Sequence, residues 1–216
     1  MEDILGFDVS GNNSEGHPVQ WDKLAPDQLR FVYIKATEGA TFEDAWFDRH
    51  WTAAHSRGLV CGAYHFYRSN RKGQDQADNI QRHILGDAQF GAGDLPVAID
   101  VEELKTVDTA SPASVKAFLS ELETCVRAVE KAMGAKPSIY TAGYVWHALG
   151  NPTNFVDCPL WIAQPATAAQ PKLPPPFTRW ALWQYSFKGK LAGITGPVDL
   201  DRFNGAEADF QALLLK

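Results

Sequence analysis

The stretch Leu95-Pro96-Val97-Ala98-Ile99-Asp100-Val101-Glu102 is an apolar run, rich in β-branched residues, that ends in two acids. Such a run predicts a buried β-strand. Side chains two positions apart on a strand share a face, so Asp100 and Glu102 point the same way with Cα atoms about 6.6 to 6.8 Å apart. Two carboxylates so placed push one pKa upward, which gives a proton donor beside an anion. For an isolated D-x-E pair, the alternative is a strand that ends in two solvated acids.

Strand-like runs alternate with amphipathic helical patterns along the whole chain. The segments that we expect to form strands are 4–10, 31–36, 59–66, 95–102, 138–141, 159–163, 180–185 and 197–201. The helical patterns between them cover 21–29, 44–57, 73–85 and 112–133. This alternation predicts βαβ units in a parallel sheet, and about eight strands predict a barrel of the (β/α)8 kind.

The C-terminal part lacks room for full helices. Leu173-Pro174-Pro175-Pro176 cannot lie inside a helix, and the glycine-rich stretch 186–197 is too short for a crossover. We therefore predict an α/β fold, an irregular and incomplete (β/α)8 TIM-like barrel with C-terminal helices missing and a hairpin-like connection there. The alternative is an open doubly wound sheet, but 8–13 does not match its G-x-G-x-x-G loop.

Composition limits the kinds of partner. The 216 residues predict one domain covering 1–216, with a net charge of −6 and no basic cluster, so we expect no nucleic acid. We see no apolar run long enough for membrane insertion. The three cysteines lie in apolar or helical patterns and are expected to be buried free thiols. The acidic start Met1-Glu2-Asp3-Ile4 shows no signal peptide, so we expect synthesis in the cytoplasm.

The ends of the expected strands carry acids, aromatic residues and one amide. In chain order these residues are Asp8, Glu38, Tyr64, Asp100 with Glu102, Tyr140, Trp161, Gln184 and Asp199. In a parallel barrel these ends converge on one mouth, where active sites lie. Carboxylates crowded together keep some protons near neutral pH, as a general acid requires.

In this arrangement the chain closely resembles the glycoside hydrolase family 25 lysozymes, the Chalaropsis-type N-acetylmuramidases. The resemblance is carried, in the family's order, by 6–10, 34–39, 62–66, 100–102, 140–141, 160–163, 183–186 and 198–201. It implies an irregular barrel with missing helices. It also implies hydrolysis, with net retention, of the β-1,4 bond between N-acetylmuramic acid and N-acetylglucosamine in peptidoglycan.

Carried over by position, Glu102 matches the family's general acid/base and Asp100 its partner. Asp100 then acts as a nucleophile or orients the substrate's 2-acetamido group. Asp8 and Asp199 match the other two acids of the site. The positions that match substrate-binding residues are Glu38, Tyr64, Tyr140, Trp161 and Gln184. Asp201 stands where many relatives have Asn, and it leaves open which acid of this strand is nearer the sugar.

Two other functions on the same barrel predict different residues at these positions. A non-catalytic peptidoglycan-binding barrel predicts the loss of Glu102 or Asp100, and both are present. A chitinase-like N-acetylhexosaminidase predicts D-x-x-D-x-D-x-E, and Ala98 stands where that run needs an acid. The six histidines show no H-E-x-x-H pattern, so we expect no metal and no cofactor.

The biological setting follows from the resemblance. We expect a monomer that reaches the cell wall, in the periplasm or outside the cell, after holin release or specialised secretion. If the enzyme is a toxin injected into rival bacteria, we expect a cognate immunity protein.

Overall fold

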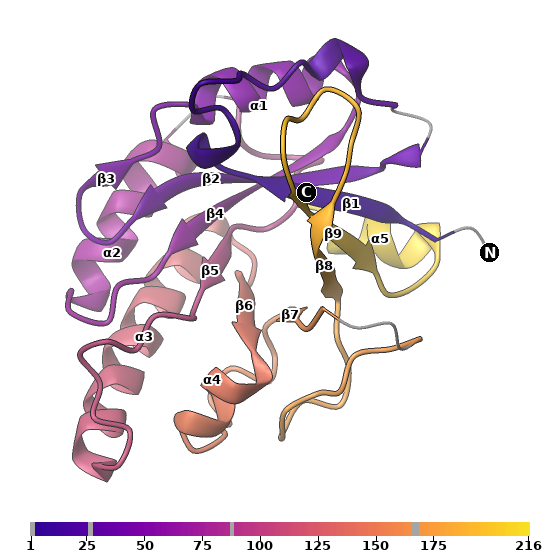
Figure 1. The fold of residues 1–216 in the computed structure, drawn as a ribbon. Helices are drawn as coiled ribbons and strands as arrows, with labels where there is room; N and C mark the ends of the chain where they lie inside the picture. Colours follow the sequence, from indigo (N-terminus) through magenta and orange to yellow (C-terminus); the bar gives the residue numbers. More distant parts are fainter. Residues whose placement is uncertain (1–2, 26–27, 87–88, 166–168) are drawn as a thin grey trace.

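The strands form a closed barrel (Figure 1) in the computed structural model, which describes residues 3–25, 28–86, 89–165 and 169–216. The barrel strands are β1 (Leu5–Val9), β2 (Phe31–Glu38), β4 (Val60–Phe66), β5 (Ala98–Asp100), β6 (Ser138–Ala142), β7 (Leu160–Ala163), β8 (Leu182–Gly189) and β9 (Val198–Phe203). The barrel closes because β1 pairs with both β2 and β9. The short β3 (Phe42–Glu43) pairs with β2 outside the ring. The predicted irregular barrel is confirmed, and the open doubly wound sheet is wrong.

One strand of the ring runs opposite to all the others. The pairs from β1 through β2 and β4 to β8 are parallel, whereas β9 is antiparallel to both of its neighbours. The predicted hairpin-like connection is therefore the one between β8 and β9. We expected Asp199 at the carboxyl end of its strand, but it lies near the start of β9. Because Asp8 is its register partner on β1, Asp199 still reaches the same mouth.

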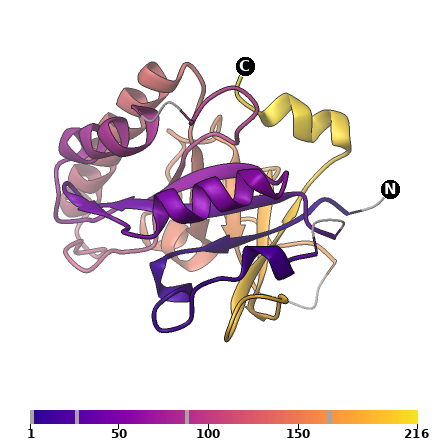
Figure 2. The ribbon, with the colours of Figure 1, turned by 90° about the horizontal axis from the view of Figure 1, so that it is seen from above.

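Helices cover mainly the first half of the barrel. They are α1 (Phe47–Ser56), α2 (Gly73–Ile80) with the π-helical turn Gln81–Leu85, and α3 (Pro112–Met133). Ser111 caps α3 by accepting a bond from the Ser114 amide, and Gly134 ends it at φ 75°. Figure 2 shows α2 and α3 side by side, with α5 (Glu207–Leu213) on another side of the barrel.

The connections after β6 are reduced, as predicted. Only the short α4 (Gly143–Ala148) follows β6, and the described residues between β7 and β8 form no helix. The sequence patterns did not predict α4 or α5. The expected helix 21–29 is wrong in its described part, where a 3-10 turn covers only Trp21–Lys23. Residues 26–27 of that prediction lie outside the described residues.

The interior of the barrel is filled with aromatic and aliphatic side chains. Phe210 of α5 packs on Phe31 and Phe203, with ring centroids 5.8 and 5.1 Å away. Because Phe31 begins β2 and Phe203 ends the antiparallel β9, α5 closes the end of the barrel opposite the mouth. The three cysteines are buried and free, as predicted. Among the described residues, no helix has the length and apolar character that crossing a membrane requires.

We predict that Gly73→Ala lowers the free energy of unfolding by about 1–3 kcal/mol, because α2 and α3 touch at this residue. A Cβ atom on Gly73 would lie 1.8 Å from the Glu121 carbonyl oxygen. The matched control is Gly91→Ala, where a Cβ meets nothing within 4 Å. Urea denaturation followed by tryptophan fluorescence measures both variants, and equal midpoints would contradict the prediction.

Candidate active site

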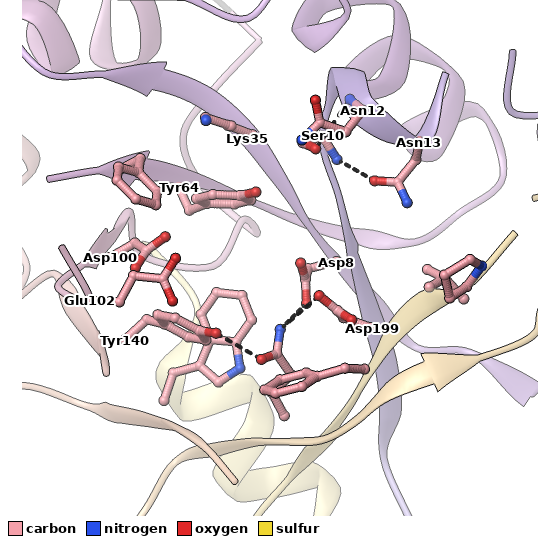
Figure 3. A pocket seen from close by; sticks show the side chains of 16 residues that line it. Asp8, Ser10, Asn12, Asn13, Lys35, Tyr64, Asp100, Glu102, Tyr140 and Asp199 are labelled. Atoms are coloured by element: carbon pink, nitrogen blue, oxygen red, sulfur yellow. Dashed lines mark hydrogen bonds between the residues drawn. The ribbon is translucent and has the colours of Figure 1, made fainter. Parts of the chain in front are cut away.

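A cavity of about 330 Å³ opens at the carboxyl ends of the parallel strands (Figure 3). Strand register explains why distant residues meet there. Asp100 is paired with Tyr140 on β6, and Tyr140 with Trp161 on β7, so all three point to the same face. Eight of the nine residues expected at the site line this cavity: Asp8, Tyr64, Asp100, Glu102, Tyr140, Trp161, Gln184 and Asp199.

Glu38 is the expected site residue that the structure does not bring into the cavity. Its carboxylate accepts hydrogen bonds from Lys35 Nζ at 2.7 Å and Arg68 Nε at 2.8 Å. Partial burial raises its pKa, but the bonds and charges of these two cations outweigh burial and hold the pKa below 4.5. Glu38 is therefore ionised at neutral pH, and it lines an adjoining depression.

Asp100 and Glu102 differ in their access to water. Asp100 is the last residue of β5 and is 5% exposed, and its Oδ1 has no hydrogen-bond partner among the described residues. Glu102 lies two residues beyond the strand and is exposed at the rim of the cavity. Figure 3 shows the two side chains next to each other on one side of the cavity.

Both carboxyl groups hold protons more tightly than ordinary acids. Burial and then the charge of Glu102 raise the pKa of Asp100 well above 3.8. Burial and then the charge of Asp199 raise the pKa of Glu102, while Lys35 opposes the shift. The pair therefore retains a proton towards neutral pH, which is the state that a general acid needs.

Gln184 connects the opposite wall of the cavity. Its Oε1 accepts a hydrogen bond from the Tyr140 hydroxyl at 2.7 Å. Its Nε2 then donates to Asp8 Oδ2 at 2.7 Å and to Asp199 Oδ2 at 3.4 Å. Because Tyr140 occupies the oxygen, the amide must present its donors to the two acids. Gln184 thus fixes the orientation of both carboxyl groups.

Of the two acids on β9, Asp199 is the one at the cavity. Asp201 is fully buried below it, where its Oδ1 accepts a hydrogen bond from Trp161 Nε1 at 2.8 Å. Burial and then the charge of Asp199 raise the pKa of Asp8 to about 7, against the lowering effect of its bond to Gln184. Burial also raises the pKa of Asp199.

Aromatic rings form the floor and one rim. Trp161 stacks on Tyr33 at 4.5 Å and meets the Tyr140 ring edge-on at 4.8 Å. A depression of about 360 Å³ at the rim shares Glu102, Tyr140 and Phe187 with the cavity, and its lining includes the exposed side chains of Tyr144 and Phe187. These side chains are 73% and 44% exposed, so they offer ring faces to a ligand. Flat apolar surfaces beside polar groups suit the faces of sugar rings.

Sequence reasoning missed several residues of the cavity. Lys35 is the only cation among the described residues that line it. The sequence feature that could have identified Lys35 is its charge inside the otherwise apolar run 31–36. Ser10, Asn12 and Asn13 enter from the turn after β1, where Asn13 Oδ1 accepts a bond from the Ser10 amide at 2.9 Å. The polar run directly after an apolar strand was the available signal for this turn.

The chemistry that this arrangement permits is acid catalysis on a polar polymer. Cleaving a glycosidic bond needs one carboxylic acid to protonate the leaving oxygen and a second carboxyl group beside it. The barrel mouth supplies both above an aromatic floor, and this combination defines a glycoside hydrolase. No group of three or more potential metal ligands occurs among the described residues.

Comparison with known proteins gives the same class. Residues 7–194 match the glycosyl hydrolases family 25, and the chain belongs to this family. It is 32% identical to protein YegX of Escherichia coli K12 over 98% of this chain and 73% of that protein. It is 30% identical to lysozyme M1 of Streptomyces globisporus over 97% of this chain and 71% of that enzyme. The solved bacterial lysozyme of Streptomyces coelicolor superposes with a TM-score of 0.85 at 28% identity, covering 99% of this chain and 98% of that one.

We predict that the free energy of unfolding falls as the pH rises from about 4 to about 7. Asp8 titrates near 3.8 in the unfolded chain and near 7 when folded, so the folded protein binds the extra proton in this window. Asp8→Asn removes this proton and flattens the slope. Urea titrations at several pH values measure it, with the exposed Asp22→Asn as control. A slope that Asp8→Asn leaves unchanged contradicts the assignment.

Proposed function

We propose that this glycoside hydrolase is a muramidase that cuts the β-1,4 bond between N-acetylmuramic acid and N-acetylglucosamine in peptidoglycan. The observation that carries the proposal is the pair Asp100 and Glu102 in the mouth of a family 25 barrel. The names of the similar proteins, lysozyme M1 and the Streptomyces coelicolor lysozyme, support the same substrate. We further propose that residues 1–216 act as a single catalytic domain.

Glu102 is the general acid in this mechanism. It is exposed at the rim, so its carboxyl group reaches a glycosidic oxygen that enters from solvent. Its raised pKa favours the protonated form that a general acid needs. The acid donates this proton to the leaving oxygen of N-acetylglucosamine as the bond to the anomeric carbon breaks.

Asp100 orients the substrate's 2-acetamido group. The buried Asp100 Oδ1, which has no partner in the described structure, is placed to accept the acetamido N–H. The acetamido carbonyl oxygen then attacks the anomeric carbon and forms an oxazolinium ion. Direct attack by Asp100 to give a covalent glycosyl enzyme is the other route to the same stereochemistry.

The second step returns the enzyme to its starting state with net retention. Glu102, now a carboxylate, removes a proton from water as the water oxygen attacks the anomeric carbon and opens the oxazolinium ring. Asp8 and Asp199, held by Gln184, face the developing positive charge from the opposite wall. Tyr64, Tyr140 and Trp161 supply the aromatic surface under the sugar.

The proposed substrate sets where the enzyme works. Peptidoglycan is the cell wall polymer, so the enzyme acts on the cell wall. We propose a monomer that reaches the wall through holin release or specialised secretion, and a cognate immunity protein where it serves as an injected toxin.

Glu102→Gln is expected to lower the initial rate of peptidoglycan cleavage by at least about 100-fold, because the amide cannot protonate the leaving oxygen. The rate is measured from the turbidity of purified walls and from new reducing ends. Glu130→Gln on α3 is the control with the same chemical change away from the cavity. A variant that clears walls at the wild-type rate contradicts the role of Glu102. Cleavage of chitin oligomers in preference to walls identifies a chitinase-like enzyme instead.

The role of Asp100 is tested by trapping. We expect a 2-fluoro sugar with a good leaving group, which has no acetamido group, to leave the mass of the enzyme unchanged. A thiazoline analogue of the oxazolinium ion is expected to inhibit competitively, and more weakly in Asp100→Asn because that variant holds the ring less well. A glycosylated peptide containing Asp100, found by mass spectrometry, would show the covalent route.

A further inference from the structure

A second depression of about 330 Å³ adjoins the catalytic cavity on the side of β2 and β4. Two chemical links show that they are neighbours. Lys35 lines the cavity and bonds Glu38, which lines the depression. Glu102 of the cavity is followed directly by Glu103 of the depression. A polymer bound across Glu102 therefore passes next to this second depression.

The two acids of the depression already accept hydrogen bonds from within the fold. Glu38 accepts hydrogen bonds from Lys35 and Arg68. Glu103 Oε2 accepts from the Ser69 amide at 3.0 Å and the Ser69 hydroxyl at 2.9 Å, and its Oε1 accepts from the Lys105 amide at 2.6 Å. Burial raises the pKa of Glu103, but these bonds outweigh it and keep the group ionised.

Two cations of the depression have no such partner. Arg71 and Lys105 are exposed, and no carboxylate of the described residues lies within ion-pair distance of either side chain. The depression is lined by three cations, Arg68, Arg71 and Lys105, and by two acids, Glu38 and Glu103, so its lining is net positive on a chain of net charge −6. Phe42, 50% exposed, adds an apolar surface to the same depression. The combination fits a ligand with carboxylates on an aliphatic chain.

We propose that this depression binds the peptide stem of peptidoglycan, with Arg71 and Lys105 pairing to stem carboxylates and Phe42 contacting its aliphatic part. The inference rests on the proposed muramidase function and extends it. The stem is attached to the lactyl group of N-acetylmuramic acid, so it leaves the glycan strand next to the cut bond. The enzyme thereby recognises the peptide as well as the sugar.

The experiment compares two forms of one substrate. Soluble glycan strands are prepared free of wall phosphate polymers, and half are stripped of their peptides with an amidase. The double variant Arg71→Gln/Lys105→Gln is expected to raise KM about three- to tenfold on peptide-bearing strands, with kcat unchanged. On stripped strands its KM is expected to stay within about twofold of wild type. The control Lys116→Gln/Lys131→Gln removes the same charge from α3.

Each outcome has a separate meaning. An equal effect on both substrates, or no effect on either, overturns the stem-binding proposal. A loss that occurs only with walls that retain their phosphate polymers shows that the depression binds phosphate, which also overturns it. Wild-type enzyme that cleaves neither form shows that the muramidase function itself is wrong.

Discussion

The antiparallel pairing of β9 with β1 is the constraint on which the site depends. It closes the barrel, and it places Asp199 of β9 opposite Asp8 of β1. The next strand in the ring, β8, supplies Gln184, whose amide bonds both acids. A parallel last strand would direct its start to the opposite end of the barrel, where α5 packs. The reversal of one strand therefore completes the fold and the ring of acids together.

The ring of acids is compatible with a stable fold because its four carboxyl groups do not all carry a full negative charge. Asp8, Asp100, Glu102 and Asp199 line one cavity, and among its described lining residues Lys35 alone is cationic. Burial raises the pKa of all four groups, and the charges of neighbouring acids raise the pKa of Asp8, Asp100 and Glu102 further, which favours their protonated forms. Gln184 stabilises the ionised form of Asp8 by donating to it. The closeness of these carboxyl groups raises the pKa values of three of them, and it thereby favours the protonated acid on which the proposed catalysis depends.

The local patterns of the sequence were enough to predict most of the architecture. Alternating strands and helices, and acids at the strand ends, follow from periodicity within short windows, and they led to the barrel and to its mouth. The short glycine-rich stretch also predicted the hairpin before β9, but not its register, in which Gly189 pairs with Val198 and Asp199 lies near the start of the strand. Residues that act through distant partners were also missed.

Glu38 and Lys35 illustrate this second limit. Glu38 stands at a strand end like the other acids, yet Arg68, thirty residues away, turns it out of the cavity. Lys35 lines the cavity, where its ammonium lies over the Phe66 ring at 5.1 Å, and the same ammonium also bonds Glu38. The spacing of Lys35 and Glu38 along one strand cannot show which of the two side chains faces the catalytic cavity, because a bond to the distant Arg68 contributes to the outcome.

The short length of β5 explains why Asp100 and Glu102, only two residues apart, differ in their exposure to solvent. The strand ends at Asp100, but the Val101 amide still donates to the Tyr140 carbonyl at 2.8 Å. The Tyr67 amide likewise donates to the Asp100 carbonyl at 2.9 Å. The backbone is thus held on both sides up to Val101, so Glu102 projects into solvent from a fixed base. In the proposed mechanism, the shielded Asp100 holds a substrate group away from water, while Glu102 exchanges protons first with the leaving oxygen and then with water.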